Sequence, residues 1–202
     1  MKLSKSGTTV AALCLAAALS VAVSQAADIK GTVTAQGMSA ENIAVYVDAI
    51  PGKTFPPPSA HAVMDQKKLM FMPHVLVVLK GTTVDFLNSD SVLHNVYWPA
   101  ISGNRKLAHN MGSWPQGVKK GFTFDNVGVA PLLCNVHQEM SGYIVVVPTP
   151  YFALTAKDGS FEIKDVPAGQ YTLKTWSEEG KPAEAPVNVS TGTATASLAV
   201  HR

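Results

Sequence analysis

Short segments rich in β-branched and aromatic residues run through most of this chain of 202 residues, and turn residues separate them. No window shows sustained helical periodicity, so we expect an all-β protein. Short strands at this spacing are typical of a β-sandwich. The expected strands are 29–34, 43–47, 75–79, 83–87, 92–98, 122–124, 127–133, 143–147, 152–155, 161–163, 171–176 and 187–189.

Prolines divide these segments into groups. The triplet 56–58 interrupts the chain before most of them, and Pro148 and Pro150 mark a second boundary. We therefore expect a domain over 55–149, a smaller β unit over 150–202 and separate N-terminal strands over 27–54. The run 143–147 is wholly apolar, which predicts a strand buried on both faces.

The N-terminal segment has the pattern of a secretory signal peptide. Lys2 and Lys5 precede an apolar run over 10–23, and residues 24–26 supply small side chains before a cleavage site. An uncleaved anchor is the alternative, but the run is shorter than the roughly 20 apolar residues of a spanning helix. We expect residues 1–26 to be removed and the mature chain to be periplasmic, with no membrane span.

Removal of the leader changes both the charge and the cysteine count. Its two lysines account for the whole net charge of +2, and a neutral mature chain without a basic patch is not expected to bind nucleic acid. Cys14 also leaves with the leader, so Cys134 has no partner for an internal disulfide. In an oxidising compartment such a thiol is either buried and inert or committed to chemistry.

Three potential metal ligands, Cys134, His137 and Met140, recur at every third residue. Strand side chains alternate with a period of two, so these three can converge only if the segment curls. Strand-like residues flank the segment on both sides, which predicts a tight loop pinned by two strands. A lone cysteine or methionine is more often a buried hydrophobe, and it is the shared spacing that indicates a metal site.

A fourth ligand must come from elsewhere, and His94, at the start of an expected strand, is the best candidate. One thiolate, two imidazoles and one thioether suit copper, and this is the donor set of blue-copper electron-transfer sites. Zinc rarely takes a thioether ligand. Haem is disfavoured because the chain has no Cys-x-x-Cys-His motif.

Several stretches resemble the cupredoxins, in particular plastocyanin-like and amicyanin-like proteins of the methylamine-utilisation type. The spacing Cys134-x-x-His137-x-x-Met140 is similar, and the resemblance extends over roughly residues 60 to 148. The other stretches that carry it are 73–75 (Pro-His-Val), 81–86 (Gly-Thr-Thr-Val-Asp-Phe), 88–90 (Asn-Ser-Asp) and 94–96 (His-Asn-Val).

The resemblance implies a Greek-key cupredoxin β-sandwich that holds one type 1 copper ion. His94, Cys134 and His137 would be the equatorial ligands and Met140 the axial one. Asn95 would hydrogen-bond the two ligand loops together, and such bonds orient ligands and tune the metal. His137 would lie nearest the surface and pass electrons to transient partners, such as a c-type cytochrome or a periplasmic dehydrogenase.

The C-terminal part resembles a carboxypeptidase-regulatory-like, transthyretin-like β-sandwich. The residues that carry this resemblance are 158–161 (Asp-Gly-Ser-Phe) and 166–173 (Val-Pro-Ala-Gly-Gln-Tyr-Thr-Leu). The Gly-x-Val strand that usually opens such a module lies far upstream, at 31–33. We therefore expect residues 28–50 to pair with residues 150–200, with the copper unit inserted between them and a structural or docking role for the module.

Electron transfer is the preferred function, and a periplasmic copper carrier or chaperone is the main alternative. An enzyme is disfavoured because the chain has neither a His-Cys-His element nor paired His-x-His motifs. An adhesive sandwich would leave the ligand loop unexplained. Met64, Met70 and Met72 are expected in the core, with transient binding of cuprous ion as the less favoured interpretation.

Overall fold

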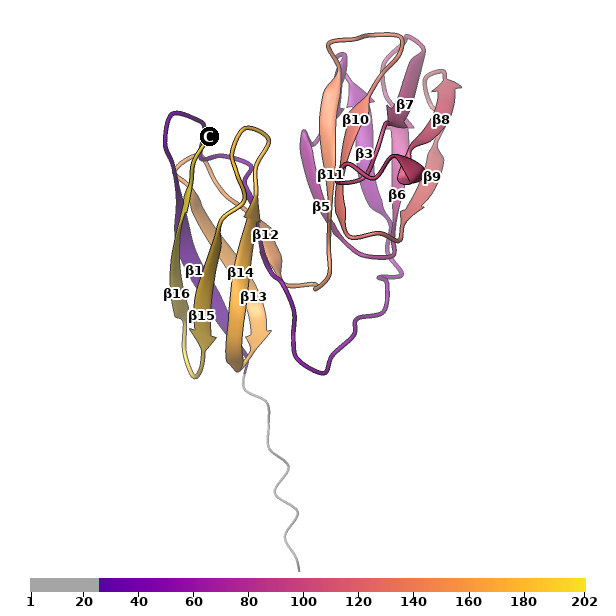
Figure 1. The fold of residues 1–202 in the computed structure, drawn as a ribbon. Helices are drawn as coiled ribbons and strands as arrows, with labels where there is room; N and C mark the ends of the chain where they lie inside the picture. The colour runs from indigo at the N-terminus through magenta and orange to yellow at the C-terminus, as the bar shows by residue number, and fades with distance from the viewer. Residues whose placement is uncertain (1–25) are drawn as a thin grey trace, which may run out of the picture.

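The computed structural model describes residues 26–202, so Cys14 and all but the last residue of the predicted signal peptide lie outside the described residues. Between residues 26 and 202 the chain forms sixteen strands and one short 3-10 helix, Arg105–Leu107, and no α-helix (Figure 1). No helix in this range is long and apolar enough to cross a membrane. The predicted all-β class is confirmed.

Strands β3 to β11 form one sandwich of two sheets (Figure 1). The orders are β4-β3-β6-β9 and β5-β11-β10-β7-β8. Its core is filled by large aromatic side chains, among them Trp98, Trp114, Phe86 and Phe124. The strands are β3 (Ala62–Lys67), β4 (Met70–Met72), β5 (Val75–Leu79), β6 (Thr82–Asn88), β7 (His94–Trp98), β8 (His109–Trp114), β9 (Lys120–Phe124), β10 (Gly128–Leu133) and β11 (Ser141–Val147).

The remaining strands form a second sandwich, with sheet orders β13-β1-β16 and β12-β2-β14-β15. Strand β1 lies between two strands from the far end of the chain, antiparallel to β13 and parallel to β16. Gly31 pairs with Phe161 and Ala196, and a Cβ atom at Gly31 would lie 2.6 Å from the Phe161 ring. The strands are β1 (Ala26–Ala35), β2 (Ala44–Val47), β12 (Phe152–Leu154), β13 (Ser160–Pro167), β14 (Gly169–Trp176), β15 (Glu184–Val189) and β16 (Ala194–Val200).

An apolar cluster joins the two sandwiches face to face. Val75 and Val77 of β5 and Val145 and Val147 of β11 pack with residues of β2, β12 and β14, including Trp176. The other faces of β5 and β11 contribute to the first sandwich's own core. This explains why the run 143–147 is wholly apolar, as the sequence predicts for a strand buried on both faces.

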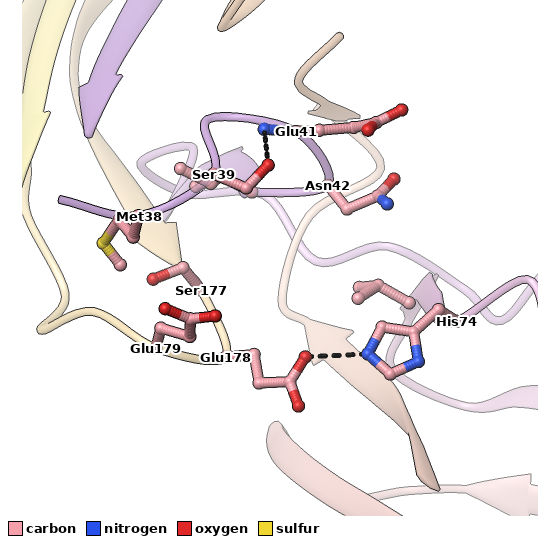
Figure 2. A pocket seen from close by; sticks show the side chains of 10 residues that line it. Met38, Ser39, Glu41, Asn42, His74, Ser177, Glu178 and Glu179 are labelled. Atoms are coloured by element: carbon pink, nitrogen blue, oxygen red, sulfur yellow. Dashed lines mark hydrogen bonds and ion pairs between the residues drawn. The ribbon is translucent and has the colours of Figure 1, made fainter. Parts of the chain in front are cut away.

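Polar contacts centred on Glu178 border this interface. Its Oε2 lies 2.7 Å from Nε2 of His74 (Figure 2), and its Oε1 accepts a 3.0 Å hydrogen bond from the Tyr143 hydroxyl. A pocket of about 190 Å³ opens beside the His74–Glu178 pair. Burial, together with the hydrogen bond to Glu178, raises the pKa of Tyr143 to about 12. The pair and the phenol connect β11 and the segment before β5 to the second sandwich.

Four strands were not predicted, namely β3, β4, β8 and β16. Their sequences are short, or they mix small and polar residues, so their apolar pattern is weak. The expectation that Met70 and Met72 lie in the core is wrong, because they are 49% and 43% exposed, whereas Met64 is fully buried. Strand β4 is an edge strand that buries only Phe71.

Candidate metal centre

The segment 134–140 forms a tight loop between β10 and β11, as its flanking strands predict. Leu133 pairs with Ser141 directly across the loop ends, so the ladder holds the loop closed at its base. Inside the loop the amide of Met140 donates to the carbonyl of His137 at 3.1 Å. This turn breaks the strand alternation that would otherwise send every third side chain to opposite faces.

His94 meets this loop because it opens strand β7, which pairs with β10. One donor atom each from His94, Cys134 and His137 lies within 4.8 Å of the others. The Nδ1 atoms of the two histidines are 3.1 Å apart. Side chains separated by forty residues in sequence thus converge on one point.

A carboxylate fixes the orientation of the His94 ring. Oδ2 of Asp90 lies 2.9 Å from Nε2 of His94, and a carboxylate only accepts hydrogen bonds. In the neutral ring the proton therefore sits on Nε2, which leaves the lone pair of Nδ1 directed at His137 and Cys134. The backbone amides of Lys68 and Leu69 also donate to Asp90, at 2.6 and 2.9 Å.

The charge of Asp90 is stabilised where it lies. Burial raises the pKa of this carboxyl, but hydrogen bonds from the Leu69 amide, from His94 and from the Lys68 amide outweigh burial and hold the pKa below its usual range. Its own amide donates to Oδ1 of Asn88 at 2.9 Å. Asn88 is buried and donates to the carbonyls of Val92 and Trp114, so the turn that carries Asp90 is held from both sides.

Asn95 joins the two segments that meet at the site. Its backbone amide donates to Sγ of Cys134 at 3.4 Å, and its Oδ1 accepts from the amide of Asn135 at 3.3 Å. Its side-chain amide donates to Oδ1 of Asn110 at 2.9 Å, which ties it to β8. The side chain of Asn95, which directly follows His94, therefore contacts the ligand loop at Asn135 and strand β8 at Asn110.

Three of the candidate ligands are buried, and the fourth lies near the surface. His94, Cys134 and Met140 are 0%, 3% and 1% exposed, and Met140 belongs to the same apolar cluster as Cys134. His137 is half-buried, and its neighbour Val136 is 46% exposed. The surroundings exclude water from the sulfur while leaving one imidazole near the surface.

The other described histidines lie away from this convergence. His61 contacts Asp85 at 3.1 Å, His74 contacts Glu178, and the ring of exposed His109 packs against Trp98 and Phe122. Asp90 is a functional residue that the sequence indicates only as part of a turn. Its contact with His94 depends on how Asn88 holds this turn, which no local pattern in the sequence specifies.

The donor set fits copper. A thiolate, two imidazoles and a nearby thioether combine the soft and borderline ligands that copper accepts in both oxidation states. Cys134 is a buried free cysteine with two imidazoles close to its sulfur. A cysteine that only packs in an apolar core has no need of such neighbours.

Comparison with known proteins matches both sandwiches to families. Residues 59–147 match the copper binding proteins of the plastocyanin/azurin family. Residues 148–197 match an fn3-type family described as domain II of polysaccharide lyase family 4. No curated protein gives a significant match.

Solved structures include similar chains. A tryptophan-to-tyrosine mutant of reduced amicyanin is 26% identical and covers 44% of this chain and 84% of its own, with a TM-score of 0.40. A methionine-to-alanine mutant of amicyanin with Cu(I) is 24% identical and covers 48% of this chain and 96% of its own, with a TM-score of 0.40. A purple cupredoxin from Nitrosopumilus maritimus is 25% identical and covers 42% of this chain and 98% of its own, with a TM-score of 0.38.

The family match and the convergent donors agree on one part of the chain. Both fall within the first sandwich, and the fn3-type match begins where that sandwich ends. Residues 59–147 are thus a copper-binding domain of the plastocyanin/azurin family, the cupredoxins, and the second β domain is fn3-like over residues 148–197.

Proposed function

We propose that this protein carries single electrons on one type 1 copper ion held by His94, Cys134, His137 and Met140. The observation that carries the proposal is the convergence of three donor atoms within 4.8 Å in a site whose cysteine and first histidine are buried. The two histidines and the cysteine would be equatorial ligands and Met140 the axial one. When bound, copper would supply a one-electron couple between its cuprous and cupric states.

The chain's own residues prepare this site for electron transfer. Asp90 holds one tautomer of His94, and Asn95 holds Cys134 through its backbone amide. The Leu133–Ser141 pair closes the base of the loop. Ligands fixed in this way move little when the charge of the site changes, which keeps the barrier to electron transfer low.

His137 is the proposed point of electron entry and exit. It is half-buried beside exposed Val136, whereas the other three proposed ligands are enclosed. A partner would dock transiently over this edge, through an interface below about 1,200 Å² in total. A c-type cytochrome or a periplasmic dehydrogenase is the proposed class of partner, which requires the chain to be exported by the leader over residues 1–26.

We also propose how the chain is divided. Residues 27–54 and 150–202 would build one domain, with the copper domain over 55–149 inserted between them. The pairing of β1 with β13 and β16 supports this division. The second domain would serve as a structural or docking platform, since it packs on β5 and β11 away from the ligand loop.

The visible spectrum after addition of one equivalent of cupric ion tests this function. Electron transfer predicts an intense thiolate-to-copper charge-transfer band, copper that resists chelators, and loss of the band in Cys134→Ser. A copper carrier predicts exchangeable metal and no such band, and that result would overturn the proposal. The Cys134→Ser protein is the matched control, because serine has nearly the same size but offers no thiolate.

A further inference from the structure

Two methionines of edge strand β4 lie at the surface of the copper domain. Met70 and Met72 are 49% and 43% exposed, although methionine is among the residue types most often buried. Phe71 between them faces the core, so the two methionines share the outer face of the sheet. Along a strand they are about 7 Å apart, which two flexible thioether side chains can bridge.

A carboxylate with an unused oxygen lies on the same face. Asp65 of β3 pairs directly with Met72, and paired residues of antiparallel strands project to the same side. Oδ2 of Asp65 accepts a 2.7 Å hydrogen bond from Ser89, but Oδ1 is buried and has no hydrogen-bond partner within residues 26–202. A buried acceptor in this state is unfavourable unless a cation or a water molecule satisfies it.

We propose that Met70, Met72 and Asp65 form a surface site for a cuprous ion, separate from the four ligands of the copper centre. Thioethers select Cu(I) among the metals of a cell, and the carboxylate oxygen balances its charge. Exposed Lys67, which pairs with Met70 on the same face, opposes a cation. Binding at this site is therefore weaker than at the centre and exchangeable.

The position of the hairpin suits a site where copper is first captured. The turn between β3 and β4 donates two backbone amides to Asp90, and Asp90 contacts His94. The surface methionines thus stand on the hairpin whose turn supports a proposed ligand. Val63 and Leu69 are also exposed, so the surroundings of the two methionines are apolar. The alternative explanation of the exposed methionines is therefore an apolar surface that binds no metal.

Methionine methyl signals in an NMR titration test the site. The full chain carrying Cys134→Ser is labelled at its methionine methyl carbons and titrated with Cu(I), as its acetonitrile complex, without oxygen. The signals of Met70 and Met72 shift together along one curve, and fully buried Met64 does not follow that curve. The Met140 signal reports separately on the copper centre, which in this variant keeps only His94, His137 and Met140 as possible ligands.

Further variants show whether Met70, Met72 and Asp65 bind one ion together or whether each methionine responds to Cu(I) independently. Met72→Leu abolishes the shift of Met70, Met70→Leu abolishes that of Met72, and Asp65→Asn raises the copper concentration needed for half of the shift. Met38→Leu, a half-buried methionine of the other domain, is the matched control and changes nothing. The proposal is contradicted if the methyl signal of Met70 or Met72 shifts with Cu(I) to the same extent when the other methionine is replaced by leucine. It is also contradicted if neither signal shifts while that of Met140 does. Joint shifts of Met70 and Met72 support this site whether or not the Met140 signal moves, because Cys134→Ser removes the thiolate of the proposed copper centre.

Discussion

Oδ2 of Asp90 lies 2.9 Å from Nε2 of His94, and the same carboxylate accepts the backbone amides of Lys68 and Leu69. One side chain therefore connects a surface turn to a ring that is fully buried at the candidate metal centre. The ring has one orientation because both of its nitrogens are committed, Nε2 to Asp90 and Nδ1 to the site.

Replacement of Asp90 by alanine should weaken copper binding about 10- to 100-fold, the usual effect of losing a hydrogen-bond partner of a ligand histidine. The ring of His94 loses the acceptor that fixes its tautomer, while the exposed turn amides find water instead. Competition with a chelator measures the affinity, and voltammetry measures the reduction potential, which should also change. Asp125→Ala, an exposed aspartate on the loop after β9, is the control and should leave both values unchanged. Equal copper affinity in Asp90→Ala and the unmodified protein would show that Asp90 does not support copper binding through His94.

Replacement of Asn95 by alanine should destabilise the copper domain by about 1–3 kcal/mol, because the amide of Asn135 loses its acceptor in a partly buried place. The backbone amide that contacts Cys134 remains, so the thiolate should still bind copper. Denaturant unfolding of the metal-free protein measures the loss. Asn126→Ala, at an exposed position, provides the comparison. An unchanged free energy of unfolding would show that Asn95 does not join the two segments in solution.

Much of this site follows from the sequence because its members obey simple rules. The period of three from Cys134 to Met140 is incompatible with a straight strand, so a loop was predictable, and His94 opens an expected strand. Asp90 was not predictable as a partner of His94, because the bond depends on how the turn 88–90 is held by Asn88. The exposure of Met70 and Met72 depends on β4 being an edge strand, which is a property of the assembled sheet.

Tyr143 should titrate at a pKa of about 12, because burial and the contact with Glu178 both disfavour the phenolate. The raised pKa contributes stability that is complete below about pH 10, the ordinary value, and is lost as the pH rises through about 12. Ultraviolet absorbance of tyrosinate, with Tyr143→Phe subtracted, measures the titration. Glu178→Gln should lower this pKa but leave it above the ordinary value, since burial persists. An ordinary pKa for Tyr143 in the unmodified protein would mean that the two sandwiches do not pack as described.

Asp85 should stabilise the copper domain at neutral pH but not in acid. The hydrogen bond from Lys119 lowers its pKa, burial partly opposes this, and the contact with His61 lowers the pKa further. Because the pKa is lower in the folded than in the unfolded chain, the contribution is present above about pH 4, the ordinary value, and is lost as the pH falls through the folded pKa. Asp85→Asn should therefore unfold at lower denaturant concentration than the unmodified protein at pH 7. The gap should narrow as the pH falls, and a gap that is constant with pH would contradict the assignment.

The arrangement of the two sandwiches is less accessible from sequence than the strands themselves. The apolar run 143–147 indicated burial on both faces, but it does not say what covers the outer face. That cover is provided by β2, β12 and β14, which come from both ends of the chain. The contact of Glu178 with His74 and Tyr143 joins residues that no local pattern relates.

A crystal structure of the protein loaded with one equivalent of copper, with anomalous data collected at the copper edge, shows directly whether these four side chains hold one ion. We expect one strong anomalous peak bonded to Nδ1 of His94, Nδ1 of His137 and Sγ of Cys134, with the sulfur of Met140 as the more distant fourth ligand. A peak elsewhere in the domain, or one from which the sulfur of Cys134 is out of bonding reach, would contradict this expectation.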